Sequence, residues 1–160
     1  MGLEHHPKCH KHSNTCMSLS SALHIVKKLN YRTAQGYSHG SLIASLYPLL
    51  SDSNSIKISH ILLSYPLGPR SWLTAFRSKH YTTTLNALVR DPRANVLVIY
   101  SDCDEFTSIG SYDAWAESLR REAGHGTGKL EVVRVENANH FWAQDAAREK
   151  MLRAVQEWLP

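Results

Sequence analysis

The sequence has little that would point to a membrane, an exported scaffold or nucleic acid. No stretch reaches the roughly 18 apolar residues of a transmembrane helix, and the opening residues, MGLEHHPKCHKH, are polar where a signal peptide would be apolar. Three cysteines are too few and too irregularly spaced for a disulfide framework. The net charge of +4 comes from scattered Lys and Arg residues and not from a basic stripe. We therefore expect a cytoplasmic protein with no membrane span and no nucleic-acid partner.

Length and composition instead favour one globular domain. The chain has 160 residues, of which 42% are hydrophobic and 20% charged, enough to bury a core. Residues 1–18 are rich in His and Lys and have no apolar period, so we expect a flexible tail followed by a domain over 19–160. This tail contains four soft metal ligands, Cys9, His10, His12 and Cys16. Their compressed spacing matches no structural zinc pattern, so we expect no metal and no cofactor.

Hydrophobic periodicity predicts alternating strands and helices. Apolar runs predict buried strands at 57–65 and 95–100, and an alternating pattern predicts another at 130–135. Helical spacing of apolar residues predicts helices at 19–29, 42–50 (closed by Pro48 or shortly after it), 72–89 (one or two), 112–123 and 144–159. This order predicts an α/β fold with a mostly parallel sheet flanked by helices. The segment LNYRTAQ (29–35) lacks the apolar run of a central strand, which leaves its local fold open.

The pentapeptide Gly36-Tyr37-Ser38-His39-Gly40 has the form G-x-S-x-G, which places a serine on a sharp turn between a strand and a helix. We expect side chains at both glycine positions to clash with neighbouring backbone, and the strained serine to present its hydroxyl. The N-terminus of the next helix would direct free amides at that hydroxyl, with the His39 amide as one oxyanion donor. The alternative is a serine in an ordinary Gly-rich loop.

Three segments together resemble the α/β-hydrolase superfamily: GYSHGS with the apolar helix after it, VLVIYSDCDEF, and VENANHFW. The resemblance covers about 19–160 and is greatest to compact esterases and dienelactone-hydrolase-like proteins. It implies the C-terminal portion of that fold, with Ser38 as nucleophile, Asp104 as acid and His140 as base, in the superfamily's chain order. Asp102 lies in the same loop and competes as the acid. For His140 the alternative is an ordinary core histidine.

The resemblance also implies an activity, the hydrolysis of carboxylic ester or thioester bonds through a Ser-His-Asp triad without a metal or cofactor. An acyltransferase would use the same triad. The small-molecule substrate would be bound by Tyr37, Trp72 and Phe76, although ordinary core packing is the alternative for Trp72 and Phe76.

Only 37 residues precede Ser38, fewer than the superfamily's N-terminal strands and second oxyanion amide require. We therefore expect a truncated hydrolase with impaired activity and an exposed sheet edge through which it self-associates. The alternative is a non-catalytic pseudohydrolase that binds a ligand or a partner.

Overall fold

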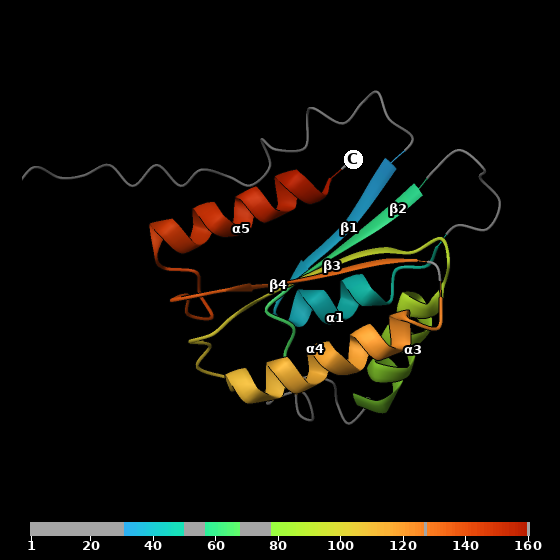
Figure 1. Ribbon diagram of the computed structural model, residues 1–160, viewed down its shortest axis with the longest axis horizontal. Helices are drawn as coiled ribbons and strands as arrows, with labels where there is room; N and C mark the ends of the chain where they lie inside the picture. Colours follow the sequence, from blue (N-terminus) through green and yellow to red (C-terminus); the bar gives the residue numbers. More distant parts are fainter. Residues whose placement is uncertain (1–30, 50–56, 68–77, 127, 160) are drawn as a thin grey trace, which may run out of the picture.

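The computed structural model describes residues 31–49, 57–67, 78–126 and 128–159, which form a parallel sheet with helices on both faces (Figure 1). The four strands of this part of the chain lie in sequence order, and every neighbouring pair is parallel. This arrangement confirms the predicted α/β class. The elements are β1 (Tyr31–Tyr37), α1 (His39–Ser45), β2 (Lys57–Leu63), α3 (Ser78–Arg90), β3 (Asn95–Ser101), α4 (Ile109–Ala123), β4 (Lys129–Val135) and α5 (Asp145–Trp158).

The central strands divide the core into two layers. On one side of the sheet Val96 and Val98 of β3 pack with buried residues of α1, α3 and α4. On the other side Leu97 and Ile99 pack with α5, including Trp158. Since successive strand residues point to opposite faces and both faces are covered, β3 requires the continuous apolar run seen in its sequence.

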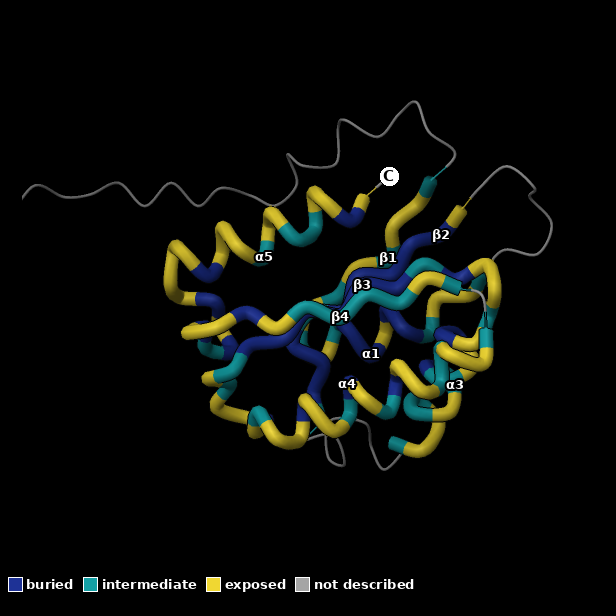
Figure 2. The backbone as a smooth tube through the Cα atoms, in the orientation of Figure 1, coloured by how far each residue is buried: buried dark blue, intermediate teal, exposed yellow. Residues whose placement is uncertain are grey.

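β1 differs from the central strands because it lies at an edge of the described sheet. It pairs with β2 from Tyr31 opposite Lys57 to Tyr37 opposite Leu63, and no residue of β1 is fully buried (Figure 2). The segment whose local fold the sequence leaves open is therefore a regular strand. It lacks an apolar run because an edge strand is held by its backbone pairing and has little to bury.

Several boundaries differ from the predicted ones. The helix expected at 42–50 begins earlier, at His39, because its first turn is built from small and polar residues that carry no apolar period. It ends at Ser45. The strand expected to reach residue 65 ends at Leu63, since Ser64 turns the chain with a positive φ of 46°. The expected helix at 19–29, the tail at 1–18 and residues 72–77 lie outside the described residues. Among the described helices, none has the length and apolar character needed to cross a membrane.

Candidate active site

The three residues expected to form a triad lie in loops at the carboxyl ends of the strands. Ser38 follows β1, Asp104 lies in the loop after β3, and His140 lies in the loop after β4. The carboxyl ends of parallel strands all lie on the same side of the sheet, so these loops converge although the residues are distant in sequence.

A chain of hydrogen bonds joins the three side chains. The Nε2 atom of His140 lies 3.1 Å from Ser38 Oγ, and its Nδ1 atom lies 2.7 Å from Asp104 Oδ2. The Asp104 side chain is completely buried and that of His140 is 7% exposed. Because a carboxylate only accepts hydrogen bonds, Nδ1 of the neutral imidazole carries the hydrogen, and Nε2 accepts one from the serine hydroxyl.

Ser38 adopts a backbone conformation that only its surroundings maintain. Its φ of 51° and ψ of −122° lie outside the regions favoured by residues other than glycine. Its N–H donates to the Leu63 carbonyl (2.9 Å), and its carbonyl accepts from the amide and the hydroxyl of Ser41 (2.9 and 2.6 Å). Ser38 is also the N-cap of α1, yet its hydroxyl makes no capping bond and faces His140 instead.

The two glycines of the motif have different roles. A Cβ atom at Gly36 would lie 2.1 Å from the carbonyl oxygen of Gly40 and 2.6 Å from the amide nitrogen of Ser41, so a side chain there is excluded. A Cβ atom at Gly40 would meet no atom within 4 Å. The expectation of a clash at Gly40 is therefore wrong. The backbone of Gly40 passes over Gly36, whereas the Cβ direction of Gly40 itself points into open space.

Asp104 is held by four hydrogen bonds. Its Oδ1 atom accepts from the backbone amides of Phe106 (2.8 Å) and Thr107 (3.0 Å). Its Oδ2 atom accepts from the Tyr112 hydroxyl (3.1 Å) in addition to His140. Burial, reinforced by the charge of Asp104, raises the pKa of Tyr112, so this hydroxyl keeps its hydrogen and remains a donor. The carboxylate therefore has one fixed orientation toward His140.

The backbone of His140 is fixed from both sides. The Glu105 carboxylate accepts from the His140 amide (2.8 Å), and the Tyr37 hydroxyl donates to the His140 carbonyl (3.0 Å). Burial, followed by the charges of Asp104 and Glu105, raises the pKa of Tyr37, which keeps its hydroxyl a donor. Tyr37, expected at the substrate pocket, thus also holds the loop that contains His140.

Asp102, the competing acid, contacts a different part of the same loop. Its Oδ1 atom accepts from the Asn137 amide (2.8 Å). Burial raises the pKa of Asp102, but hydrogen bonds from Cys103 and from the backbone at Asn137 and Ala138 outweigh this effect and hold the pKa below its usual value. Asp102 fastens the loop after β4, whereas Asp104 is the carboxylate bonded to the His140 ring.

A second anchor lies under the same loop. The buried Trp142 donates from Nε1 to Ser64 Oγ (3.1 Å), and both residues have positive φ angles. The neighbouring Phe141 is 65% exposed. Sequence reasoning missed Ser64, Glu105 and Tyr112 as parts of this site. The pattern around Tyr112 indicates only the buried face of a helix and says nothing about its hydroxyl.

Other expected or candidate site residues are not among those that the structure describes. Trp72 and Phe76 lie outside the described residues, as do the four soft ligands of the tail. Within the described ranges no group of three or more His, Cys, Asp or Glu side chains is arranged to hold a metal ion.

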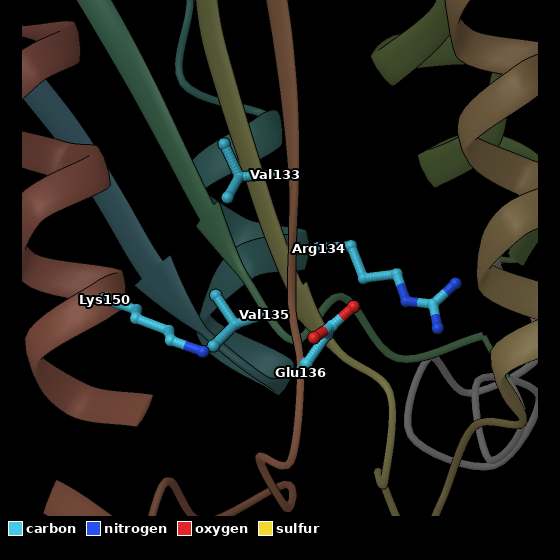
Figure 3. A pocket seen from close by; sticks show the side chains of 5 residues that line it. All are labelled: Val133, Arg134, Val135, Glu136 and Lys150. Atoms are coloured by element: carbon cyan, nitrogen blue, oxygen red, sulfur yellow. The ribbon is translucent and has the colours of Figure 1, made fainter. Parts of the chain in front are cut away.

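A depression of about 400 Å³ lies beside β4, away from the triad residues. Val133 and Val135 border it on the side of α5, together with Lys150, and Arg134 lies on the side of α4 (Figure 3). Glu136 completes its lining.

Comparison with known proteins gives likeness in structure only. No protein-family model matches the chain, and no curated protein matches its sequence. Solved structures similar to it include an esterase domain from Rhodothermus marinus (18% identity, TM-score 0.53, 79% of this chain and 58% of that one). An esterase from Thermogutta terrifontis with bound propionate matches at 18% identity and a TM-score of 0.51, over 79% of this chain and 54% of that one. A Pyrococcus furiosus esterase matches at 18% identity and a TM-score of 0.51, over 81% and 52%.

These matches show the fold, which is of the α/β-hydrolase type found in esterase structures. The chain spans between half and three fifths of the length of the structures it matches.

Proposed function

We propose that the protein hydrolyses carboxylic ester or thioester bonds by acyl transfer to Ser38. The observation that carries this proposal is the hydrogen-bonded chain from Ser38 through His140 to Asp104, with the serine on a strained turn at the start of a helix. A serine hydroxyl is a weak nucleophile until a base takes its proton, and here Nε2 of His140 lies within reach of that proton.

The reaction follows from these contacts. Ser38 Oγ forms a bond to the acyl carbon while its proton passes to His140 Nε2, and Asp104 stabilises the imidazolium through Nδ1–H. The proton on Nε2 then passes to the leaving oxygen or sulfur as its bond to carbon breaks. Water attacks the acyl-serine in a second step and gives a proton to His140 Nε2. That proton returns to Ser38 Oγ as the bond between Oγ and the acyl carbon breaks, and the acid is released.

The amide of His39 is the proposed oxyanion donor. His39 is the first residue of α1, and the first N–H groups of a helix have no partner within that helix. Negative charge that develops on the carbonyl oxygen beside Ser38 would therefore meet a free donor at the positive end of the helix.

The structural comparisons support the same class of reaction. A Thermogutta terrifontis esterase similar to this chain is described as phosphoramylated by tabun (16% identity, TM-score 0.52), and another structure of it holds propionate. An organophosphate is a reagent for an activated nucleophile of the kind proposed for Ser38, and a short carboxylic acid is a product that ester hydrolysis releases.

Labelling with a fluorophosphonate probe tests the proposal. We expect the wild type to be labelled and to hydrolyse p-nitrophenyl acetate, whereas Ser38→Ala and His140→Ala do neither. Ser45→Ala is the matched control, because this serine is the last residue of α1, the helix that Ser38 precedes, and its hydroxyl donates to Leu42 O instead of to His140. Labelling that persists in Ser38→Ala, or folded wild-type protein that is neither labelled nor active, would refute the proposal.

The open edge of β1 supports a second, non-catalytic property, self-association by strand pairing. Within the described residues β1 pairs only with β2, so its other side presents backbone donors and acceptors. We expect sedimentation velocity to show a dimer whose population rises with concentration. A monomer at all concentrations would contradict this.

A further inference from the structure

Two exposed phenylalanines stand beside the His140 ring. Phe106, in the loop after β3, is 50% exposed, and Phe141, in the loop after β4, is 65% exposed. Large apolar side chains exposed in this way are costly unless something contacts them in use. Neither ring has a part in the hydrogen-bond network, which uses only the backbone amide of Phe106.

The three rings pack against one another, and the two exposed ones are those of Phe106 and Phe141. The Phe106 and Phe141 centroids lie 4.8 and 5.4 Å from that of His140, and the two phenylalanine planes make angles of 81° and 85° with the imidazole. The phenylalanine centroids are only 6.0 Å apart. Since that distance is far shorter than the sum of the other two, both rings lie on the same side of the imidazole. They therefore offer one aromatic surface, here called the Phe106–Phe141 pair.

The proposed chemistry says which part of a substrate reaches this surface. His140 Nε2 delivers its proton to the leaving oxygen, which requires that oxygen within roughly 3 Å of the nitrogen. The group attached to the leaving oxygen therefore begins beside the imidazole, whose aromatic neighbours are Tyr37, Phe106 and Phe141. The acyl group, attached to the carbon that Ser38 attacks, has no such requirement.

We propose that the Phe106–Phe141 pair binds the alcohol portion of the substrate, and that this portion is aromatic or comparably apolar. This inference rests on the function proposed above. Benzene rings offer no conventional hydrogen bond, so an anionic alcohol would lose water there without replacement. An aromatic alcohol can pack edge to face on the pair, as the pair does on His140.

Two series of esters separate the alcohol portion from the acyl portion. The first keeps the acyl group and varies the alcohol: methyl, butyl and benzyl acetate. The second keeps methanol and varies the acid: methyl acetate, butyrate and hexanoate. Release of acid is followed in a pH-stat for the wild type, the double variant Phe106→Ala/Phe141→Ala and the control Leu152→Ala. Leu152 is likewise a large exposed apolar residue (52%), but it lies on α5.

We expect the wild type to prefer benzyl over methyl acetate by about tenfold in kcat/KM. The double variant should lose this preference and keep its acyl selectivity, and Leu152→Ala should keep both. An unchanged benzyl preference in the double variant, or a change in acyl selectivity instead, would overturn the inference while leaving the proposed function intact. A wild type inactive on every ester and unlabelled at Ser38 would overturn both. A dimer that dissociates in the double variant would assign the pair to a second copy of the chain and also overturn the inference.

Discussion

Replacing Gly36 by alanine tests how the turn after β1 positions Ser38, the proposed nucleophile. The added methyl carbon would lie 2.1 Å from the Gly40 carbonyl oxygen, whereas ordinary contact begins at 3.4 Å. The first turn of α1 must therefore retreat by roughly 1.3 Å, and strain of this kind costs about 1–3 kcal/mol of folding free energy. Because Ser38 lies between these glycines, its hydroxyl moves with the turn. Misplacement by about 1 Å costs on the order of a hundredfold in rate.

Gly40→Ala is the matched control, since its methyl group would meet nothing within 4 Å and residue 40 lies in a helix. Alanine in place of a helical glycine stabilises by about 0.5–1 kcal/mol. We expect urea unfolding to show Gly36→Ala less stable than the wild type and Gly40→Ala equal or more stable. Fluorophosphonate labelling should slow about a hundredfold in Gly36→Ala alone. Equal stability and equal labelling of the two variants would refute the reasoning.

Three further tests address separate parts of the structure. Tyr112→Phe removes only the hydroxyl bonded to Asp104, so fluorophosphonate labelling should slow roughly tenfold while the KM for p-nitrophenyl acetate stays unchanged. Labelling at the wild-type rate would contradict the positioning role. Asp104→Asn should slow labelling by on the order of a thousandfold or more, whereas Asp102→Asn should change it only a few-fold; the reverse order would identify Asp102 as the acid. Burial lowers the pKa of His60 below its usual 6.5, so the unfolded state binds the proton first. The stability that neutral His60 contributes should be fully present above pH 6.5 and lost below it, by at most about 1.4 kcal/mol per pH unit. His60→Gln should lack this loss in urea unfolding, and equal pH dependence of the two proteins would contradict it.

The order of elements could be read from the sequence because both faces of the central strands are covered. Residues 96–100 are all buried, and that burial is visible in the sequence as an unbroken apolar run. β1 could not be predicted in the same way, since an edge strand with exposed side chains leaves no such run. Its presence depends on backbone pairing with β2, which the sequence of β1 alone does not encode.

Within the site, the resemblance to the α/β-hydrolase superfamily predicted Ser38, Asp104 and His140, and these side chains meet because each follows a strand and parallel strands end together. The residues that hold these three side chains in place could not be predicted from the sequence, for a physical reason. Tyr112 is buried by its ring, and the hydroxyl that reaches Asp104 leaves no trace in an apolar pattern. The contrast between Gly36 and Gly40 depends on which backbone passes over which Cα atom, a property of three-dimensional packing.

The hydrogen bond from Tyr37 to the His140 carbonyl closes a ring, because Tyr37 and Ser38 are consecutive in the chain and the Ser38 hydroxyl meets the His140 imidazole. The ring runs from β1 through the Tyr37 side chain to the His140 carbonyl, and from the His140 imidazole back through the Ser38 side chain. A displacement of β1, the least buried of the described strands, therefore strains two hydrogen bonds to His140 at once, that of Tyr37 and that of Ser38. The proposed nucleophile and base are thus held to each other by contacts from two consecutive residues of the chain.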